Sequence, residues 1–129
     1  MKKLMVLSGD PALQRFFHQN FRMESYPVND VPADDVGLRR LLEKVQPELI
    51  IVDIGMPRMD GIETCLRIRR LSDVPVIMLT GWRTADGKVK GFDPGSDSYL
   101  TESFDASELR EKIDDAIRAK ERYQLLRSS

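Results

Sequence analysis

LIIVDIGMPRMDG, residues 49–61, is an aliphatic run that ends on a carboxylate and continues into a turn rich in proline and glycine. The four aliphatic residues before Asp53 are typical of a strand that is buried on both faces. Open α/β sheets bind ligands in the crevice beyond the carboxyl ends of their strands, which is where Asp53 stands. Asp53 therefore has two interpretations: it caps the turn, as aspartate often does, or it performs chemistry at the sheet edge.

The rest of the chain alternates apolar strands with helical patterns. Further strands are expected at residues 3–7, 25–28, 75–80 and 98–101. Helices are expected at residues 11–21, from 34 or 35 up to Pro47, at 61–71, at 82–92 and after the capping box that begins at 105. Pro27 demotes the second strand to an edge position, because proline has no N–H for a sheet ladder. This alternation with short loops predicts an α/β fold of the flavodoxin-like (βα)5 type. Its doubly wound parallel sheet has the strand order 2-1-3-4-5.

The expected helices carry start signals and apolar faces. Asp10-Pro11 provides an N-cap and an N1 proline, Asp34 or Asp35 can start the next helix, and Asp105 to Glu108 form a capping box. The residues expected to face the core are Leu13, Phe16, Phe17 and Phe21, then Val36, Leu38, Leu41, Leu42 and Val45, then Ile62, Cys65 or Leu66, and Ile68 or Leu71, and finally Leu109, Ile113, Ala116 and Ile117.

The helix expected at residues 82–92 is the weakest one. Gly87 and Gly91 each lower helix stability by about 1 kcal/mol relative to alanine. Residues 119–129 contain few core-type side chains, so we expect the last helix to run beyond its own domain.

Size and composition exclude several classes of protein. A chain of 129 residues suits one domain, and its net charge of −1 provides no field that would attract nucleic acid or an anionic membrane. There is no basic stripe or recognition helix, so this segment is not expected to bind DNA itself. Cys65 is the single cysteine, which excludes an internal disulfide. With no membrane-span or signal-peptide pattern, we expect a cytoplasmic protein.

Polar residues follow the ends of the expected strands. Ser8-Gly9 come after the first strand, Asp53 ends the third, Thr80 ends the fourth, and Glu102 follows the fifth. A carboxylate beside a hydroxyl at this edge is suited to accept a phosphoryl group. The carboxylate attacks, while the hydroxyl and backbone N–H groups hold the phosphoryl oxygens.

These residues resemble a known family. The sequence resembles the receiver domain of bacterial two-component response regulators in three blocks: DIGMPRMDG at residues 53–61, VIMLT at 76–80 and GSDSYLTESF at 95–104. The resemblance covers about residues 3 to 120, and the first block is the most specific. Its closest likeness is to receivers that are fused to winged-helix DNA-binding domains.

The resemblance implies roles for individual positions. Asp53 matches the aspartate that takes a phosphoryl group from a sensor kinase histidine. Thr80 matches the hydroxyl that responds to that phosphate. Tyr99 matches the aromatic side chain whose inward or outward rotamer reports the state of the receiver. We expect residues 1–120 to form the receiver domain, with residues 121–129 as the end of a helix or the start of a linker.

Two metal-binding positions depart from the family pattern. Receivers usually have two adjacent acidic residues after the first strand, which hold Mg²⁺ together with the acceptor carboxylate. This chain has Ser8 and Gly9 there. With only Asp53 and the carbonyl of Gly55 left, Mg²⁺ binding is expected to be weak or absent, because Mg²⁺ depends on hard oxygen ligands. Asp10 is best interpreted as an N-cap; a compensating role in metal binding is the alternative.

The phosphate-binding lysine of the family is also replaced. Glu102 stands at that position and Ser103 replaces the proline that follows it. A like-charge contact at about 4 Å, with an effective dielectric near 20, opposes phosphoryl transfer by on the order of 4 kcal/mol. If Glu102 faces Asp53, the site could respond to pH or take up a basic side chain, with Arg58 and Arg83 as candidates. The alternative is that Glu102 points to solvent.

The leading hypothesis is therefore an atypical receiver that acts through protein–protein contacts and is not an enzyme. Its partner is a sensor histidine kinase or another signalling protein, and a homodimer or a DNA-binding output domain is a further candidate. The contact surface is expected on the helix at 82–92, the strand at 98–101 and the helix from 106. Its mixed charges are Arg110, Glu111, Lys112, Asp114 and Asp115.

Two other function classes stay open. One is a working receiver that is phosphorylated on Asp53 by a sensor histidine kinase and controls a DNA-binding output domain. The other is an unrelated flavodoxin-like binder of a nucleotide or flavin. This chain lacks the glycine-rich phosphate loop that such a binder needs, because residues 8–11 contain only one glycine and a proline.

Overall fold

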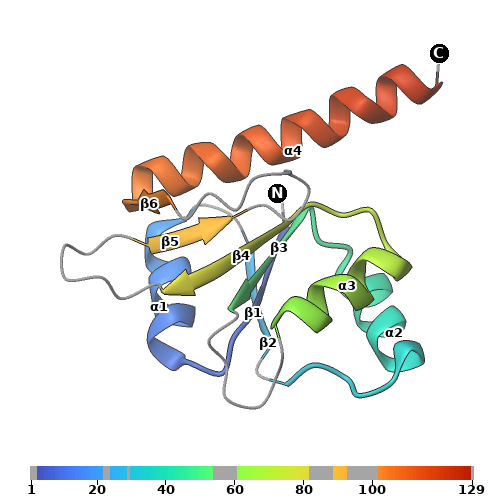
Figure 1. The fold of residues 1–129 in the computed structure, drawn as a ribbon, viewed down its shortest axis with the longest axis horizontal. Coiled ribbons are helices and arrows are strands. Elements are labelled where there is room, and N and C mark those ends of the chain that lie inside the picture. The colour runs from blue at the N-terminus through green and yellow to red at the C-terminus, as the bar shows by residue number, and fades with distance from the viewer. Residues whose placement is uncertain are drawn as a thin grey trace.

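A twisted sheet forms the centre of the computed structural model, with helices on both of its faces (Figure 1). The structure describes residues 3–21, 24–28, 30–53, 61–81, 89–92 and 102–128. The strands are β1 Lys3–Leu7, β2 Glu24–Val28, β3 Leu49–Asp53, β4 Val76–Gly81, β5 Val89–Phe92 and β6 Glu102–Phe104. The helices are α1 Pro11–Asn20, α2 Asp35–Val45, α3 Gly61–Leu71 and α4 Ala106–Ser128.

The first four strands have the order and direction that the sequence predicted. The described strands follow the order β2-β1-β3-β4-β5-β6, and β1 pairs in parallel with both β2 and β3, while β3 pairs in parallel with β4. The order 2-1-3-4 is thus confirmed. Pro27 lies in β2, the strand at one edge of the described sheet. Proline lacks a backbone N–H, and at an edge this removes no hydrogen bond to a further strand.

The second half of the sheet differs from the prediction. Residues 89–92 were expected to be helical, but they form β5, which runs antiparallel to β4 and pairs with β6 on its other side. The prediction is wrong there because glycine weakens a helix, while Val89 and Phe92 are strand formers; Phe92 lies opposite Met78. The strand expected at 98–101 and residues 82–88 lie outside the described residues.

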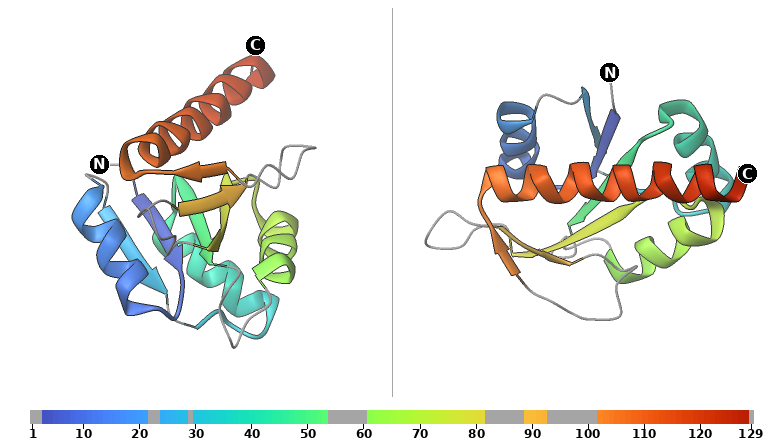
Figure 2. Two further views of the ribbon diagram at one scale, coloured as in Figure 1. Left: turned by 60° about the vertical axis from the view of Figure 1, so that its left-hand side comes forward. Right: turned by 90° about the horizontal axis from the view of Figure 1, so that it is seen from above.

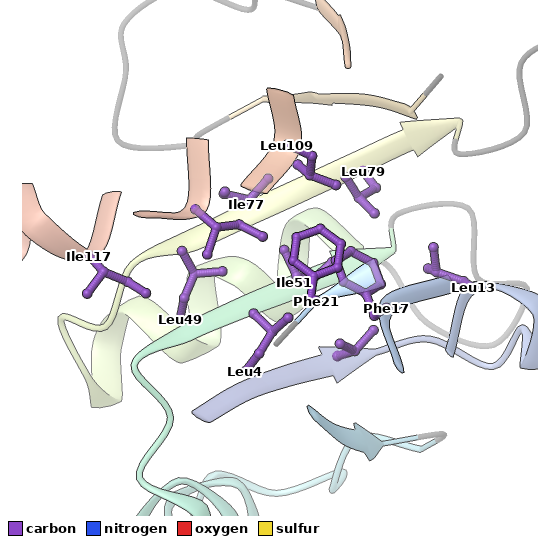
Figure 3. Close-up of a cluster of buried hydrophobic side chains, with 12 residues drawn as sticks. Leu4, Leu13, Phe17, Phe21, Leu49, Ile51, Ile77, Leu79, Leu109 and Ile117 are labelled. Atoms are coloured by element: carbon purple, nitrogen blue, oxygen red, sulfur yellow. The ribbon is translucent and has the colours of Figure 1, made fainter. Parts of the chain in front are cut away.

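Two hydrophobic cores lie on opposite faces of the sheet. Alternate residues of β1, β3 and β4 point to each face, so each strand contributes to both cores. One core contains Leu4, Val6, Leu49, Ile51, Ile77 and Leu79 of the sheet with Leu13, Phe17, Phe21, Leu109, Ile113 and Ile117 of α1, its C-cap and α4 (Figure 3). The other contains Met5, Leu7, Ile50, Val52, Val76 and Met78 with Leu38, Leu42, Val45, Cys65, Ile68 and Val74.

The structure resolves the expected helix faces. In α2, Leu38, Leu42 and Val45 are buried, but Val36 is 61% exposed, so the prediction for Val36 is wrong. Val36 lies in the first turn of α2, on nearly the opposite side of the helix from Leu38, Leu42 and Val45. In α3, Cys65 is buried and Leu66 is exposed, and Thr64 is a buried polar residue that the pattern did not indicate.

Short-range capping contacts start three of the helices. Asp10 accepts a hydrogen bond from the N–H of Ala12, Asp34 accepts one from Gly37, and Asp105 accepts one from Glu108. Each carboxylate satisfies a backbone donor that a helix leaves unpaired in its first turn.

The last helix, α4, is longer than the sheet that it covers. Its Leu109, Ile113 and Ile117 are buried, and Lys120 forms an ion pair with Asp73 in the loop before β4. The hydrogen bond from Lys120 lowers the pKa of the Asp73 carboxyl. Residues 121–126 are exposed, and the end of α4 projects from the body of the domain (Figure 2). Within the described residues, no helix is both long and apolar enough to span a membrane.

A charge cluster joins α2 to α3 and makes stability depend on pH. Arg67 Nε lies 3.2 Å from Asp35 Oδ1, and Arg70 Nη2 lies 3.4 Å from Asp35 Oδ2. The hydrogen bond from Arg67 lowers the pKa of Asp35 below its ordinary value of 3.8. A carboxyl with a lowered folded-state pKa stabilises the fold above its unfolded pKa and loses this contribution as pH falls through the folded pKa.

We therefore expect the wild type to be more stable than Asp35→Asn at neutral pH. The two free energies of unfolding should converge as the pH falls from 3.8 through the lowered folded-state pKa of Asp35, because the wild-type side chain then also becomes uncharged. Urea unfolding over a series of pH values measures this. The difference should also shrink in high salt, since Asp35 is half exposed. A difference that changes with neither pH nor salt would contradict this role.

Candidate functional site

Ser8 and Asp53 meet at the carboxyl ends of two neighbouring strands. Ser8 directly follows β1 and Asp53 is the last residue of β3, and the two strands pair in register. The hydroxyl of Ser8 donates a hydrogen bond to Asp53 Oδ2 over 2.9 Å. Ser8 is 0% exposed and Asp53 is 8% exposed. The convergence that the sequence predicted for these two positions is thus observed as a buried contact.

The direction of this hydrogen bond follows from the second partner of Ser8. The backbone N–H of Asp10 donates to Ser8 Oγ over 3.0 Å. An amide N–H can only donate, so it occupies a lone pair of the hydroxyl and leaves the hydroxyl proton for Asp53. Asp53 therefore receives a donor from Ser8, and Ser8 links the start of α1 to the end of β3.

The turn between β1 and α1 is short and fixed at several points. Ser8 N–H donates to the carbonyl of Val28 over 3.1 Å, which ties the turn to β2. Asp10 caps α1, the role that its position before a proline indicated. Gly9 is exposed, and a Cβ placed on it would meet no atom of the described residues within 4 Å. A larger side chain at position 9 therefore has room beside the site.

Gln14 is a residue of the site region that sequence reasoning missed. Its Nε2 donates to the carbonyl of Val6 over 3.0 Å and to that of Ser8 over 3.1 Å. A glutamine in the second turn of an amphipathic helix usually faces solvent, so its position alone carried no signal. Only the close approach of α1 to the end of β1 brings the amide to these carbonyls.

The other predicted site residues are described only in part. Thr80 lies in β4 and Glu102 begins β6, but their side chains are outside the described residues, as are Gly55, Arg58, Arg83 and Tyr99. The strand expected at 98–101, directly before Glu102, lies outside the described residues. β6 is the edge strand and is separated from β3 by β4 and β5. At about 4.8 Å per strand, its backbone is roughly 14 Å from that of β3.

The described residues supply few oxygen donors for Mg²⁺ at the site. They are one carboxylate, Asp53, and one hydroxyl, Ser8, whose proton points at that carboxylate. Mg²⁺ requires near-octahedral oxygen ligands and is usually bound through one or two carboxylates, together with waters and substrate phosphates. Across the described ranges, no three His, Cys, Asp or Glu side chains are grouped as a metal site.

Removal of the Ser8 hydroxyl should destabilise the domain. A hydrogen bond to a buried charged group contributes about 1.5–3 kcal/mol, so Ser8→Ala should lower the free energy of unfolding by about 2 kcal/mol. Chemical denaturation measures this. Ser107→Ala is the control, because Ser107 is exposed and should change stability by less than about 0.5 kcal/mol. Equal effects of the two variants would show that the buried contact contributes nothing.

Comparison with known proteins decides the family. Residues 4–114 match the family described as response regulator receiver domain. The chain belongs to this family. The resemblance carried by the three sequence blocks is confirmed, and the order of the first four strands of this receiver is the one expected from it.

Similar regulators are about twice as long as this receiver chain. The DNA-binding dual master transcriptional regulator RpaA of Synechocystis is 34% identical over 125 residues, which cover 95% of this chain and 52% of RpaA. The response regulator ArlR of Staphylococcus epidermidis is 31% identical over 118 residues, covering 92% of this chain and 53% of ArlR. The chain therefore spans about half the length of these relatives.

Solved receiver structures share the fold. A CheY-like response regulator receiver domain protein from Methanospirillum hungatei has a TM-score of 0.66 at 19% identity. The match covers 95% of this chain and 98% of that one. The N-terminal domain of the nisin resistance regulator NsrR has a TM-score of 0.64 at 17% identity, with 91% and 98% coverage. At these identities the likeness concerns the fold alone.

Proposed function

We propose that this receiver is an atypical member of its family. It retains Asp53 at the phosphoacceptor position but lacks the groups that make phosphoryl transfer efficient, and it signals mainly through protein–protein contacts. Ser8 and Gly9 replace two acidic residues, and Glu102 replaces a lysine. The Mg²⁺ site is accordingly weak or absent, and the chain is a signalling module and not an enzyme.

The observation that carries this proposal is the hydrogen bond from Ser8 to Asp53. In a receiver, a carboxylate oxygen attacks phosphorus while nearby positive charge neutralises the phosphoryl oxygens. In this chain a hydroxyl proton already occupies one oxygen of Asp53, which makes that oxygen a poorer nucleophile. The hydroxyl brings no charge that could replace a divalent cation.

The remaining site residues take the roles that the family resemblance gives them. Asp53 is the phosphoacceptor position, and Thr80 and Tyr99 are the positions that would respond to a change there. Glu102 places a negative charge where the family has a positive one. Its distance along the sheet from β3 favours the interpretation in which Glu102 does not face Asp53.

The partners of this receiver follow from its surface and its relatives. We propose that residues 1–120 form the signalling domain and that residues 121–129 begin a linker to an output domain. Two features support this: residues 121–126 of α4 are exposed beyond the part of the helix that packs on the sheet, and RpaA is a DNA-binding regulator about twice as long. A sensor histidine kinase, another signalling protein or a second copy would bind the surface that includes α4.

The alternative is a working receiver that a sensor histidine kinase phosphorylates on Asp53. The identity of 34% to RpaA over 95% of the chain favours it, because such similarity is compatible with shared chemistry. The two proposals differ in one measurable property, the rate at which Asp53 takes up a phosphoryl group in the presence of Mg²⁺.

Labelling with acetyl phosphate and Mg²⁺, followed by intact-mass spectrometry, tests the proposal. We expect no more product from the wild type than from Asp53→Asn, which lacks the acceptor. A working receiver of known activity, treated in the same way, shows that the reagent is active. Rapid, stoichiometric addition of one phosphoryl group to the wild type, abolished in Asp53→Asn, would establish the alternative.

A further inference from the structure

Gln14 links α1 to the strand end that carries Ser8. Its Nε2 donates to two carbonyls of that strand end, those of Val6 and Ser8, at 3.0 and 3.1 Å. Only the NH₂ side of a carboxamide can donate, so these two acceptors fix the orientation of the side chain. Its Oε1 is consequently buried, with no hydrogen-bond partner within the described part of the chain.

Packing alone does not account for a glutamine at this position. A buried carbonyl oxygen without a hydrogen-bond partner is unfavourable. Methionine would fill a similar volume and has no such oxygen. The feature that glutamine has and methionine lacks is the pair of N–H donors. Both donors bind carbonyls at the end of β1: that of Val6, inside the strand, and that of Ser8, which directly follows it.

We propose that Gln14 is a positioning residue for the site. It holds the carbonyl of Ser8 while the N–H of Asp10 binds Ser8 Oγ, and the hydroxyl is thereby directed at Asp53. The chain of contacts runs from α1 through Ser8 to β3 and requires no divalent cation. The inference rests on the proposed function only in taking Asp53 as the centre of the site.

The experiment compares Gln14→Met with the wild type by amide hydrogen exchange and by the NMR shift of the Asp53 carboxyl carbon. Exchange of the Asp10 amide should become about tenfold faster, since its hydrogen bond to Ser8 Oγ loosens. The Asp53 carbon should shift as well. The slowest amides of β3, which report global unfolding, should keep their protection, because an unpaired acceptor has been removed.

Two further variants make the result specific. Gln14→Lys keeps N–H donors on a chain of similar length and should restore slow exchange at Asp10. Gln19→Met lies on the exposed side of the same helix and should leave both signals unchanged. Unchanged exchange at Asp10 and an unchanged Asp53 shift in Gln14→Met would overturn the inference. An equal loss of protection at all amides would overturn it as well, because Gln14 would then be only structural.

This test is independent of the labelling assay. Rapid phosphorylation of wild-type Asp53 would refute the proposed function. The inference about Gln14 would still be decided by the exchange of the Asp10 amide in Gln14→Met. Absence of labelling together with unchanged exchange in Gln14→Met would refute only the inference about Gln14.

Discussion

The double variant Ser8→Asp/Gly9→Asp is expected to gain a response to Mg²⁺ that the proposed function makes weak or absent in the natural chain. Position 9 has open space for a side chain, and an aspartate at position 8 would stand next to Asp53. Without a cation, three carboxylates at one edge of the sheet repel one another. When Mg²⁺ is present, the same groups provide the hard oxygen ligands that it prefers. The unfolding midpoint should therefore lie below that of the wild type in EDTA and rise as Mg²⁺ is added.

The same variant should also take up phosphoryl groups faster. A metal ion that neutralises the developing phosphoryl charge contributes several kcal/mol, which corresponds to a rate on the order of a hundredfold higher or more. The control is Ser8→Asn/Gly9→Asn, which has side chains of the same size without charge and should show no Mg²⁺ effect on either property. A double aspartate variant that behaves like this control would mean that the loss of acidic residues at 8 and 9 does not explain the site.

Phe17→Ala is expected to destabilise the domain more than Ser8→Ala or Asp35→Asn. Phe17 is fully buried between α1 and the sheet, and its ring stacks on that of Phe21 with centroids 5.0 Å apart (Figure 3). Truncation of a buried phenylalanine leaves a cavity and typically lowers the free energy of unfolding by about 3–5 kcal/mol. That is a large part of the roughly 5–15 kcal/mol by which a folded domain is usually stable.

The neighbouring Phe16 provides a matched control for this prediction. It has the same side chain on the same helix but is only partly buried against the core. Phe16→Ala should therefore lower stability by clearly less than Phe17→Ala, because less apolar area returns to water. Chemical denaturation of both variants measures the difference. Losses of equal size would contradict the assignment of Phe17 as the inner residue of this pair.

Local chemistry made much of the fold predictable. Asp10, Asp34 and Asp105 start helices through contacts that span only two or three residues, so the sequence around each was sufficient. The aliphatic runs before Ser8 and Asp53 are long and unbroken, which leaves few alternatives to buried strands. The meeting of Ser8 and Asp53 followed from topology, because parallel strands end at one edge.

Features that depend on tertiary contacts were not predictable in the same way. Residues 89–92 have a mixed pattern, and pairing of Phe92 with the strand that contains Met78 decides between strand and helix. Val36 lies nearly opposite the buried face of α2 and is exposed, so its apolar character alone was misleading. Gln14 and the direction of the Ser8 hydrogen bond required the position of α1 over β1, which no local pattern contains.

A titration of the wild-type receiver with Mg²⁺, followed by NMR, addresses the proposed loss of the metal site without any phosphodonor. The signals to follow are the carboxyl carbon of Asp53 and the amides of Gly9 and Asp10. These signals should stay unchanged at Mg²⁺ concentrations that saturate a working receiver, because the Ser8 hydroxyl already donates a hydrogen bond to Asp53. Saturable shifts centred on Asp53, with loss of the Ser8 contact, would show instead that the site still binds the cation.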